Sequence, residues 1–450
     1  MSTVYSVKKG LDINLIGEAD KTVVDLNVKR FAIKPTDFIG CFPKLLSKEG
    51  DTVKVGTPLF FDKYRQNIIF TSPVSGKFVE LRRGAKRKIL ELVIESDGKF
   101  EAIDFGKEDI TKVTRENITD KLLKSGIWPL IRQRPYAVIA NPTDSPKSIF
   151  VTAFNSAPLA PDYNFIIKGK EHAFQAGLDI LTKLTDGKVH LNVHKKLTTS
   201  ETFLNATNVQ VNIFDGPHPS GNASVHISRV DPINKGDVIW YLDATDVITI
   251  GNLFITGKYD SSKIVALTGS EVQNPKYYNT HAGASIEDMI AYNILGVNNR
   301  YISGNVLTGT KIESNGFLGF YDNQVTVIPE GNYYEFFGWA KPGFGKWSYS
   351  RTYPAGWFRG KKKYRLDTNM HGSKRAFVVT GLYEQVFPFD IYPMQLMKAI
   401  LVEDIDLMEN LGIYEIDAED FALCEVIDPS KIDMQEIVRN GLELMRKEMS

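Results

Sequence analysis

A glycine-containing segment in the middle of the chain has residue types that could hold a phosphate group. It reads FDGPHPSGNASVHISRVDP over residues 214–232. Gly216 and Gly221 would let backbone amides approach an anion closely, and His218 and Arg229 would add positive charge. The segment is not G-x-G-x-x-G, and that dinucleotide fingerprint occurs nowhere in the chain. We therefore interpret it as a plain turn, with a nucleotide or flavin site as the alternative.

Two histidines have the spacing of a metal site on a helix. His190 and His194 lie four residues apart in KVHLNVH. However, Val189, Leu191 and Val193 alternate with them, which is typical of a strand with a polar outer face. No carboxylate or thiol motif supplies further ligands, so the sequence predicts a strand here and no metal site.

A lysine near a predicted hairpin could carry a covalent cofactor. Residues 60–81, FFDKYRQNIIFTSPVSGKFVEL, predict two strands around a turn, closed by a Ser-Pro-Val-Ser-Gly corner. This arrangement resembles domains that carry biotin or lipoate on a lysine at a hairpin tip. Counted back from Pro73 at the spacing of those domains, the attachment position falls on Arg65, and a guanidinium is not acylated as a lysine amine is. Lys63 lies nearby without the usual flanking residues, so we predict the scaffold without the cofactor.

The most unusual composition lies at residues 333–365, where aromatic residues are mixed with lysine and arginine. Such a segment can stack on bases, lie at a membrane interface or form hot spots against another protein. A buried loop that covers the core, with its lysines solvated, is the structural alternative. A second aromatic and basic segment, GIWPLIRQRPY, spans residues 126–136.

The elements that must position these residues predict an α/β and α+β multidomain protein. Short strands between Gly, Pro and Asp turns predict a small β-sandwich, of the biotinyl/lipoyl-carrier kind, over residues 1–100. Alternating strand-like and helix-like runs predict a Rossmann-like α/β domain over 101–257. We expect a small β-grasp-like α+β module over 258–330, an aromatic and basic interface segment over 331–376 and a C-terminal helical domain over 377–450.

Composition excludes several classes of protein. Lysine plus arginine and aspartate plus glutamate both number 54, so the chain has no basic excess for general nucleic-acid binding. Two cysteines, Cys41 and Cys424, are too few for a cysteine-ligated iron–sulfur cluster. We expect no signal peptide and no transmembrane helix, because charge interrupts every long apolar stretch. Without G-x-S-x-G, H-E-x-x-H or P-loop motifs, no catalysis is expected from the isolated chain.

Over its whole length the chain resembles the A subunits of the sodium-translocating NADH:quinone oxidoreductases (Na+-NQR), which are bacterial respiratory complexes. The resemblance rests on segments that occur in order along the chain: KKGLDINLIGEA, PKLLSKEGDTVKVGTPLFFDK, FTSPVSGKFVELRRGAKRKILELVIE, DGPHPSGNASVHISRVDPINKGDVIWYLDATDVITIGNLFITG and RTYPAGWFRGKKKYRLDTNMHGSKRAFVVTGLYEQVFPFDIYPMQLMKAILVEDID. A weaker resemblance connects it with the related Rnf electron-transport complex, whose corresponding subunit carries cysteine-bound clusters. The alternative is therefore an Rnf-type subunit that binds NADH and FMN through residues 214–232.

The Na+-NQR resemblance implies a peripheral subunit on the cytoplasmic face of the bacterial inner membrane. Such a subunit holds no redox cofactor of its own; NADH, FAD, FMN, riboflavin and iron–sulfur centres belong to the five partner subunits. Its central domain looks like the flavin- and NADH-binding subunit of complex I without those sites. Ubiquinone, the substrate of the complex, is expected near the contact with the B subunit in the membrane, so membrane association is indirect. No nucleic acid is expected as a partner.

No motif places the quinone or subunit contacts. Composition alone nominates the two aromatic and basic segments, and within them these residues: Trp128, Arg132, Arg134, Trp339, Trp347, Arg351 and Trp357.

Overall fold

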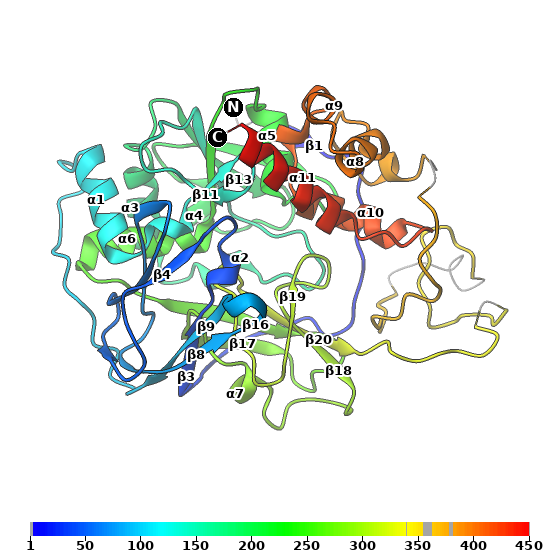
Figure 1. Cartoon of the computed structure of the whole chain (residues 1–450), viewed down its shortest axis with the longest axis horizontal. Helices are drawn as coiled ribbons and strands as arrows, with labels where there is room; N and C mark the ends of the chain where they lie inside the picture. The colour runs from blue at the N-terminus through cyan, green and yellow to red at the C-terminus, as the bar shows by residue number, and fades with distance from the viewer. Residues whose placement is uncertain (1–2, 339, 354–361, 378–380, 450) are drawn as a thin grey trace.

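The structure is a computed structural model that describes residues 3–338, 340–353, 362–377 and 381–449. Four groups of elements follow one another along the chain, with the C-terminal helices beside the central sheet (Figure 1). The expected mixed α/β, multidomain organisation with a helical C-terminal region is thereby confirmed. None of the helices within the described ranges is long and apolar enough to cross a membrane.

Seven short strands between residues 30 and 96 form two antiparallel sheets, in the orders β3-β9-β8-β5 and β4-β6-β7. Buried aromatic side chains hold them together: Phe60 and Phe70 stack with their ring centroids 4.4 Å apart, and Phe38 lies against both rings. The bounds are β3 (Arg30–Ile33), β4 (Pro43–Leu45), β5 (Thr52–Val53), β6 (Pro58–Asp62), β7 (Arg65–Thr71), β8 (Gly76–Arg83) and β9 (Ile89–Ser96).

The hairpin of β6 and β7 is confirmed, but the residue at its tip differs from the expected one. Asp62 pairs with Arg65, so Lys63 and Tyr64 form the turn. Arg65 instead folds back: its Nε lies 2.9 Å from Asp62 Oδ2, and its Nη1 donates to the Ile139 carbonyl at 2.8 Å. The tip position that was counted back from Pro73 was wrong, because the pairing of β6 with β7 shifts register within this hairpin.

The strands within the first 25 residues pair outside the two sheets of this β domain. Strand β1 (Val4–Ser6) pairs in parallel with β14 (Gln210–Asp215) of the central sheet. Strand β2 (Asp20–Asp25) pairs in parallel with β17 (Lys276–His281) of a six-stranded sheet, which we call the third sheet because it follows the β domain and the central sheet along the chain. The N-terminal segment therefore joins two other parts of the chain.

The central sheet has the order β1-β14-β13-β12-β15-β10-β11, parallel from β1 to β15 and antiparallel at β10 and β11. Helices α3 and α6 cover one face, and α5 covers the other. The bounds are β10 (Arg132–Arg134), β11 (Val138–Ile139), β12 (Ser148–Thr152), β13 (Lys188–His194), β15 (Ile239–Asp243), α1 (Arg115–Ser125), α2 (Tyr163–Ile166), α3 (Glu171–Leu181), α4 (Glu201–Leu204), α5 (Ala223–Val230) and α6 (Ala244–Thr256).

Two glycines let α3 and α6 approach each other closely. A Cβ atom at Gly251 would lie 1.8 Å from the Ala173 carbonyl oxygen, and one at Gly177 would lie 2.1 Å from the Val247 carbonyl oxygen. Only glycine permits backbones this close, so these positions fix how the helices lie on the sheet.

A six-stranded third sheet has the order β19-β18-β20-β16-β17-β2, and the C-terminal helices form a separate core with the outer face of the central sheet. The loop before β20 connects this third sheet to the β domain, because the Phe320 amide donates to Asp37 Oδ2 at 2.8 Å. The bounds are β16 (Ser262–Thr268), β18 (Asn299–Ser303), β19 (Thr310–Ile312), β20 (Gln324–Pro329), α7 (Glu287–Ile290), α8 (Pro393–Leu401), α9 (Ile405–Asn410), α10 (Ala422–Ile427) and α11 (Met434–Glu448).

Candidate functional site

The first place to look for a ligand is the carboxyl ends of β12 and β15, where the strand order of the central sheet reverses. Open α/β sheets bind ligands at this point. Here β20 closes it: Gln324 Nε2 donates to the Pro158 carbonyl at 3.4 Å, and Asn323 Nδ2 donates to Thr245 Oγ1 at 3.1 Å. A cavity beside Thr245 and Asn323 measures about 30 Å³, which is the volume of about one water molecule.

Arg132 connects the central sheet to the third sheet at this closed point. Its guanidinium lies between the rings of Tyr241 and Tyr321, 4.6 and 4.5 Å from their centroids, and 3.9 Å from Asp243 Oδ2. Tyr321 in turn donates to the Pro129 carbonyl at 2.7 Å. Cation–π contacts with two rings are stronger in a desolvated site, so Arg132 here acts as a connector between domains.

Burial raises the pKa of two carboxyl groups at this junction toward neutral pH. Desolvation raises the pKa of Asp246 to about 7, and the charge of Asp243 acts in the same direction. Desolvation also raises the pKa of Asp37 to about 6, although Lys34 opposes the shift. Burial lowers the pKa of Lys263, whose ammonium donates to the Phe320 carbonyl.

Arg134 connects the central sheet to the C-terminal helices. It is 2 % exposed, and its Nη1 lies 2.8 Å from Asp417 Oδ2 while Nη2 lies 3.3 Å from Glu419 Oε1. Arg439 of α11 also binds Asp417. Burial alone would raise the pKa of Asp417, but the two arginines outweigh it and lower that pKa; burial and the charge of Asp420 raise the pKa of Glu419 to about 7.

The glycine segment 214–232 is filled by the chain itself. A Cβ at Gly216 would lie 2.1 Å from the Val7 carbonyl oxygen, and His218 accepts at its carbonyl from the Leu11 amide at 2.8 Å. The Gly221 amide donates to Ser156 Oγ at 2.9 Å. Gly216 therefore accommodates the N-terminal segment, which lies where the alternative interpretation placed a phosphate.

The histidines of this region form a buried polar layer, which corrects the expected solvent-facing side of β13. His190 and His194 are both buried: the ring of His190 stacks on Phe150 with the centroids 4.8 Å apart, and that of His194 lies 5.2 Å from Phe154. His226 of α5 donates from Nε2 to the Ser220 carbonyl at 2.8 Å. Burial lowers the pKa of His190 and His218 to about 4 and that of His226 to about 3.

His226 should make unfolding sensitive to mild acid. Its pKa is lowered in the folded chain, so its contribution to stability is complete above about pH 6.5 and is lost as the pH falls toward 3. Between pH 7.5 and 5.0 the native chain should lose about 2 kcal/mol more unfolding free energy than His226→Gln, measured by urea titration at each pH. The comparison cancels all other titrating groups. Equal losses in the two proteins would show that folding does not lower the pKa of His226.

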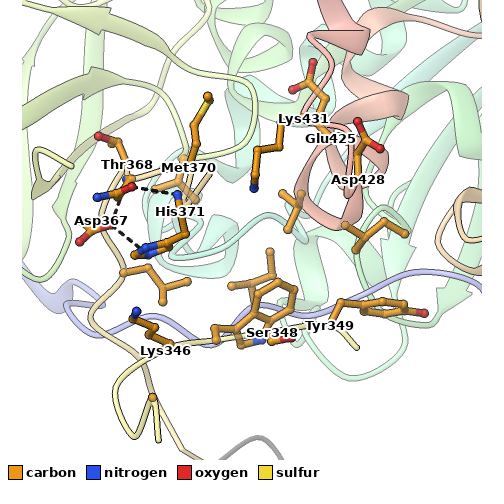
Figure 2. A pocket seen from close by; sticks show the side chains of 18 of the residues that line it. Lys346, Ser348, Tyr349, Asp367, Thr368, Met370, His371, Glu425, Asp428 and Lys431 are labelled. Carbon is orange, nitrogen blue, oxygen red and sulfur yellow. Dashed lines mark hydrogen bonds and ion pairs between the residues drawn. The ribbon is translucent and has the colours of Figure 1, made fainter. Parts of the chain in front are cut away.

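A large cavity, with a volume of about 1660 Å³, lies between the third sheet, residues 341–353 and 365–371, and the turn that follows α10 (Figure 2). Trp347 and Arg351 line it; Trp339 and Trp357 lie outside the described residues. Trp128, by contrast, is 0 % exposed, and its Nε1 donates to the Ala140 carbonyl at 2.8 Å. The nominated residues that the structure describes thus fall into two groups, one enclosed between parts of the fold and one at this cavity.

Lys431 is a lining residue that no sequence pattern indicated. Its ammonium points into the cavity (Figure 2), and no hydrogen bond or ion pair to it is seen within the described residues. Burial and the charge of Arg375 lower its pKa, although Asp428 opposes them. The neighbouring His371 lies 4.0 Å from Asp367. The cavity therefore offers an apolar and aromatic wall with an available cationic hydrogen-bond donor.

Known proteins similar to the chain cover its whole length. Family models match at residues 5–97 ("NqrA N-terminal barrel-sandwich hybrid domain"), 113–259 ("NqrA second alpha/beta domain") and 264–314 ("NQRA C-terminal domain"). The A subunit of the Na(+)-translocating NADH-quinone reductase of Vibrio atlanticus (strain LGP32) is 38% identical over 450 residues, 99% of this chain and 100% of that protein. The A subunit of the Rhodopirellula baltica reductase is 37% identical over 453 residues, with 99% of each chain covered.

Among solved structures, an NAD+-reducing NiFe hydrogenase in the air-oxidized state superposes with a TM-score of 0.38 at 12% identity. That superposition covers 74% of this chain and 61% of the hydrogenase chain.

Proposed function

The chain belongs to the NqrA family, the A subunits of the Na+-translocating NADH-quinone reductases, and from this premise we propose how it serves such a complex. It acts as a peripheral subunit that assembles the complex and borders the quinone site, without bond chemistry of its own. The observation that carries this proposal is the match over 99% of the chain to relatives that are named as this subunit. The complex itself oxidises NADH, reduces quinone and exports sodium.

The cavity beside Trp347 and Arg351 is the part of the chain that we assign to the quinone and to the partner in the membrane. An aromatic wall and the available Lys431 donor suit a planar ring that carries carbonyl oxygens. Trp339 and Trp357 lie on the same segment in sequence and are included on composition. For the enclosed residues Trp128, Arg132 and Arg134, we assign a role in holding the domains in register.

Partners and location follow from the family. We propose that the chain contacts the membrane-embedded B subunit most directly, on the cytoplasmic face of the bacterial inner membrane, among five partner subunits. NADH, FAD, FMN, riboflavin and iron–sulfur centres would be held by those partners. A yellow, flavin-containing preparation of this chain alone would instead favour the Rnf-type alternative.

The finer domain assignments are also proposals. The parallel strands β14, β13, β12 and β15 with helices on both faces support a Rossmann-like domain at residues 101–257. The mixed sheet with α7 supports a β-grasp-like module at 258–330. Residues 331–376 are then the interface segment, and 377–450 the helical domain.

Photo-crosslinking tests the quinone assignment. A photoreactive quinone analogue in the assembled complex should label peptides that contain Trp347 or Lys431, and excess unlabelled quinone should suppress the label. Label only on the partner subunits would reduce the role of this chain to assembly.

Trp347→Ala with Arg351→Ala should lower, at least fivefold, the amount of the chain that co-purifies with the B subunit, because both side chains border the proposed contact. Affinity purification through a tag on the B subunit measures this. Tyr64→Ala, which removes an exposed aromatic ring at the tip of the β6–β7 hairpin, is the matched control and should leave recovery unchanged. Full recovery of the double variant would contradict the assignment.

A further inference from the structure

Lys431, in the turn between α10 and α11, has a backbone conformation that lysine rarely adopts. Its φ is +58°, in the left-handed region that favours glycine and asparagine. Side chains held on such a backbone cluster at active sites and ligand clamps. Here the backbone directs the lysine into the cavity that we assign to the quinone (Figure 2). The conformation therefore supports a role for the ammonium group inside the cavity.

Contacts with the neighbouring chain segment fix where the end of this side chain lies. The Arg375 amide donates to the Ser430 carbonyl at 2.9 Å, and Ser430 Oγ donates to the Ala376 carbonyl at 2.9 Å. A Cβ atom at Gly372 would lie 3.2 Å from Lys431 Cε. The end of the lysine is therefore packed against the backbone of this segment, beside the cavity.

No carboxylate among the described residues forms an ion pair with this ammonium group. Asp428 belongs to the same turn, but its Oδ1 accepts from Tyr383 Oη at 2.7 Å. The amides of Ser430 and Ile432 also donate to this carboxylate, at 2.9 and 2.8 Å. The other carboxylates that line the cavity have partners as well: Glu425 with Gln435, Asp433 with Lys374, Asp367 with Tyr333 and Glu335 with Lys341.

The charges that face Lys431 favour release of its proton. Burial, followed by the charge of Arg375, lowers its pKa, and Asp428 does not outweigh them. A lysine whose pKa is lowered gives up its proton more readily. Burial and the charge of Lys346 also lower the pKa of the neighbouring His371, so that ring is mainly neutral at pH 7 and is a poorer proton source. Lys431 itself is half-buried, so water can return a proton to its amine.

Reduction of a quinone to a quinol adds two electrons and two protons to the ring. We propose that Lys431 donates one of these protons. As the complex delivers two electrons from NADH, one Nζ–H bond breaks and an O–H bond forms on the carbonyl oxygen that meets the ammonium group. The neutral amine then takes its proton back from water, and the second carbonyl oxygen is protonated from solvent.

This step rests on the proposed function, which assigns the cavity to the quinone. It also goes beyond that function, in which the chain borders the quinone and changes no bond. Lys431 is then a catalytic residue of the assembled complex, while the electrons still reach the quinone through the partner subunits.

Lys431→Arg in the assembled complex separates the proton from the charge, because a guanidinium is cationic but does not give up its proton. The kcat for quinone reduction by NADH should fall about 100-fold, and the KM for quinone should change by less than about twofold. Reduction of ferricyanide, which takes electrons without protons, should be unchanged. Lys374→Arg is the matched control, since its ammonium is already paired with Asp433, and it should leave both rates unchanged.

Ammonium ions of two kinds test the same step by rescue. Lys431→Ala should lose quinone reduction, and methylammonium, which has N–H protons to give, should restore the rate about tenfold. Tetramethylammonium has the same charge and no N–H proton, so it should not restore the rate. Retained ferricyanide reduction verifies that the variant complex is assembled.

An unchanged kcat in Lys431→Arg, or equal rescue by the two ammonium ions, would overturn the proposal. Photo-crosslinking of the Lys431→Arg complex distinguishes this failure from failure of the proposed function. A label on the Trp347 peptide that excess quinone suppresses would keep the quinone in the cavity and remove only the proton transfer. Absence of label from this chain in both the native and the variant complex would overturn both.

Discussion

Arg134→Met lowers the free energy of unfolding by about 3–5 kcal/mol, the largest loss that we expect from a single side chain. Arg134 is almost completely buried between β10 and the C-terminal helices, where it neutralises Asp417 and Glu419. Methionine fills a similar volume but removes this partner from the buried Asp417 and from Glu419, whose side chain is 35 % exposed. Arg439 still binds Asp417 and water reaches Glu419, so we expect the loss to lie toward the lower end of this range.

The pH dependence of this loss identifies its cause. The pKa of Glu419 is already raised to about 7, so a carboxyl group left unpaired can protonate in mild acid. The difference between the native chain and Arg134→Met should therefore be smaller at pH 6 than at pH 8, measured by urea unfolding. Arg87→Met, at an exposed arginine, is the control and should change stability by less than about 0.5 kcal/mol. A loss independent of pH would indicate a packing defect instead.

Gly251→Ala should cost about 3 kcal/mol, because the new methyl group meets backbone rather than a movable side chain. Its Cβ would lie 1.8 Å from the Ala173 carbonyl oxygen and 2.8 Å from the Gly177 nitrogen, so α6 must move away from α3. Thermal and urea unfolding measure the effect.

Gly441→Ala in α11 is the matched control, since both glycines lie inside helices. There the added Cβ would meet side-chain carbons of Ile400 at 2.8 Å or more, and these can shift. The helix propensity of alanine offsets part of that cost, so a change within about 1 kcal/mol is expected. If the two substitutions cost the same, close backbone packing of α3 on α6 is not what Gly251 provides.

Local signals in the sequence were sufficient for elements whose partners are near in the chain. The β6–β7 hairpin was predicted from its turn and corner, and β13 from the alternation in KVHLNVH. The burial of His190 was missed because the alternation shows only that one side of the strand is polar. It does not show whether another part of the fold covers that side. Here Asn192 and Asn212 bond to one another at 3.1 Å, and Asn212 lies 3.3 Å from His190, so the polar layer satisfies itself.

Pairings across long stretches of sequence were not predictable in the same way. The basic segment 126–136 and the acidic run 402–425 were each visible as compositions, but nothing in either shows that Arg134 binds Asp417. At the cavity, aromatic composition indicated Trp347, whereas Lys431 is a single lysine without a pattern. Only the fold shows that this lysine lines the cavity, in the turn that follows α10.

The pairing of the first 25 residues bears on how the chain is made. Val4 lies opposite Ile213 and Val24 opposite Tyr278, so each N-terminal strand finds its neighbour only after more than 200 further residues have been translated. At cellular elongation rates that delay is on the order of ten seconds or more. During it, two extended segments stay without partners on the ribosome while the β domain between them and the central sheet can already collapse. A fragment that starts at residue 26 would lack an edge strand in two sheets, and in the full chain these two strands can become native only after β14 and β17 have been made.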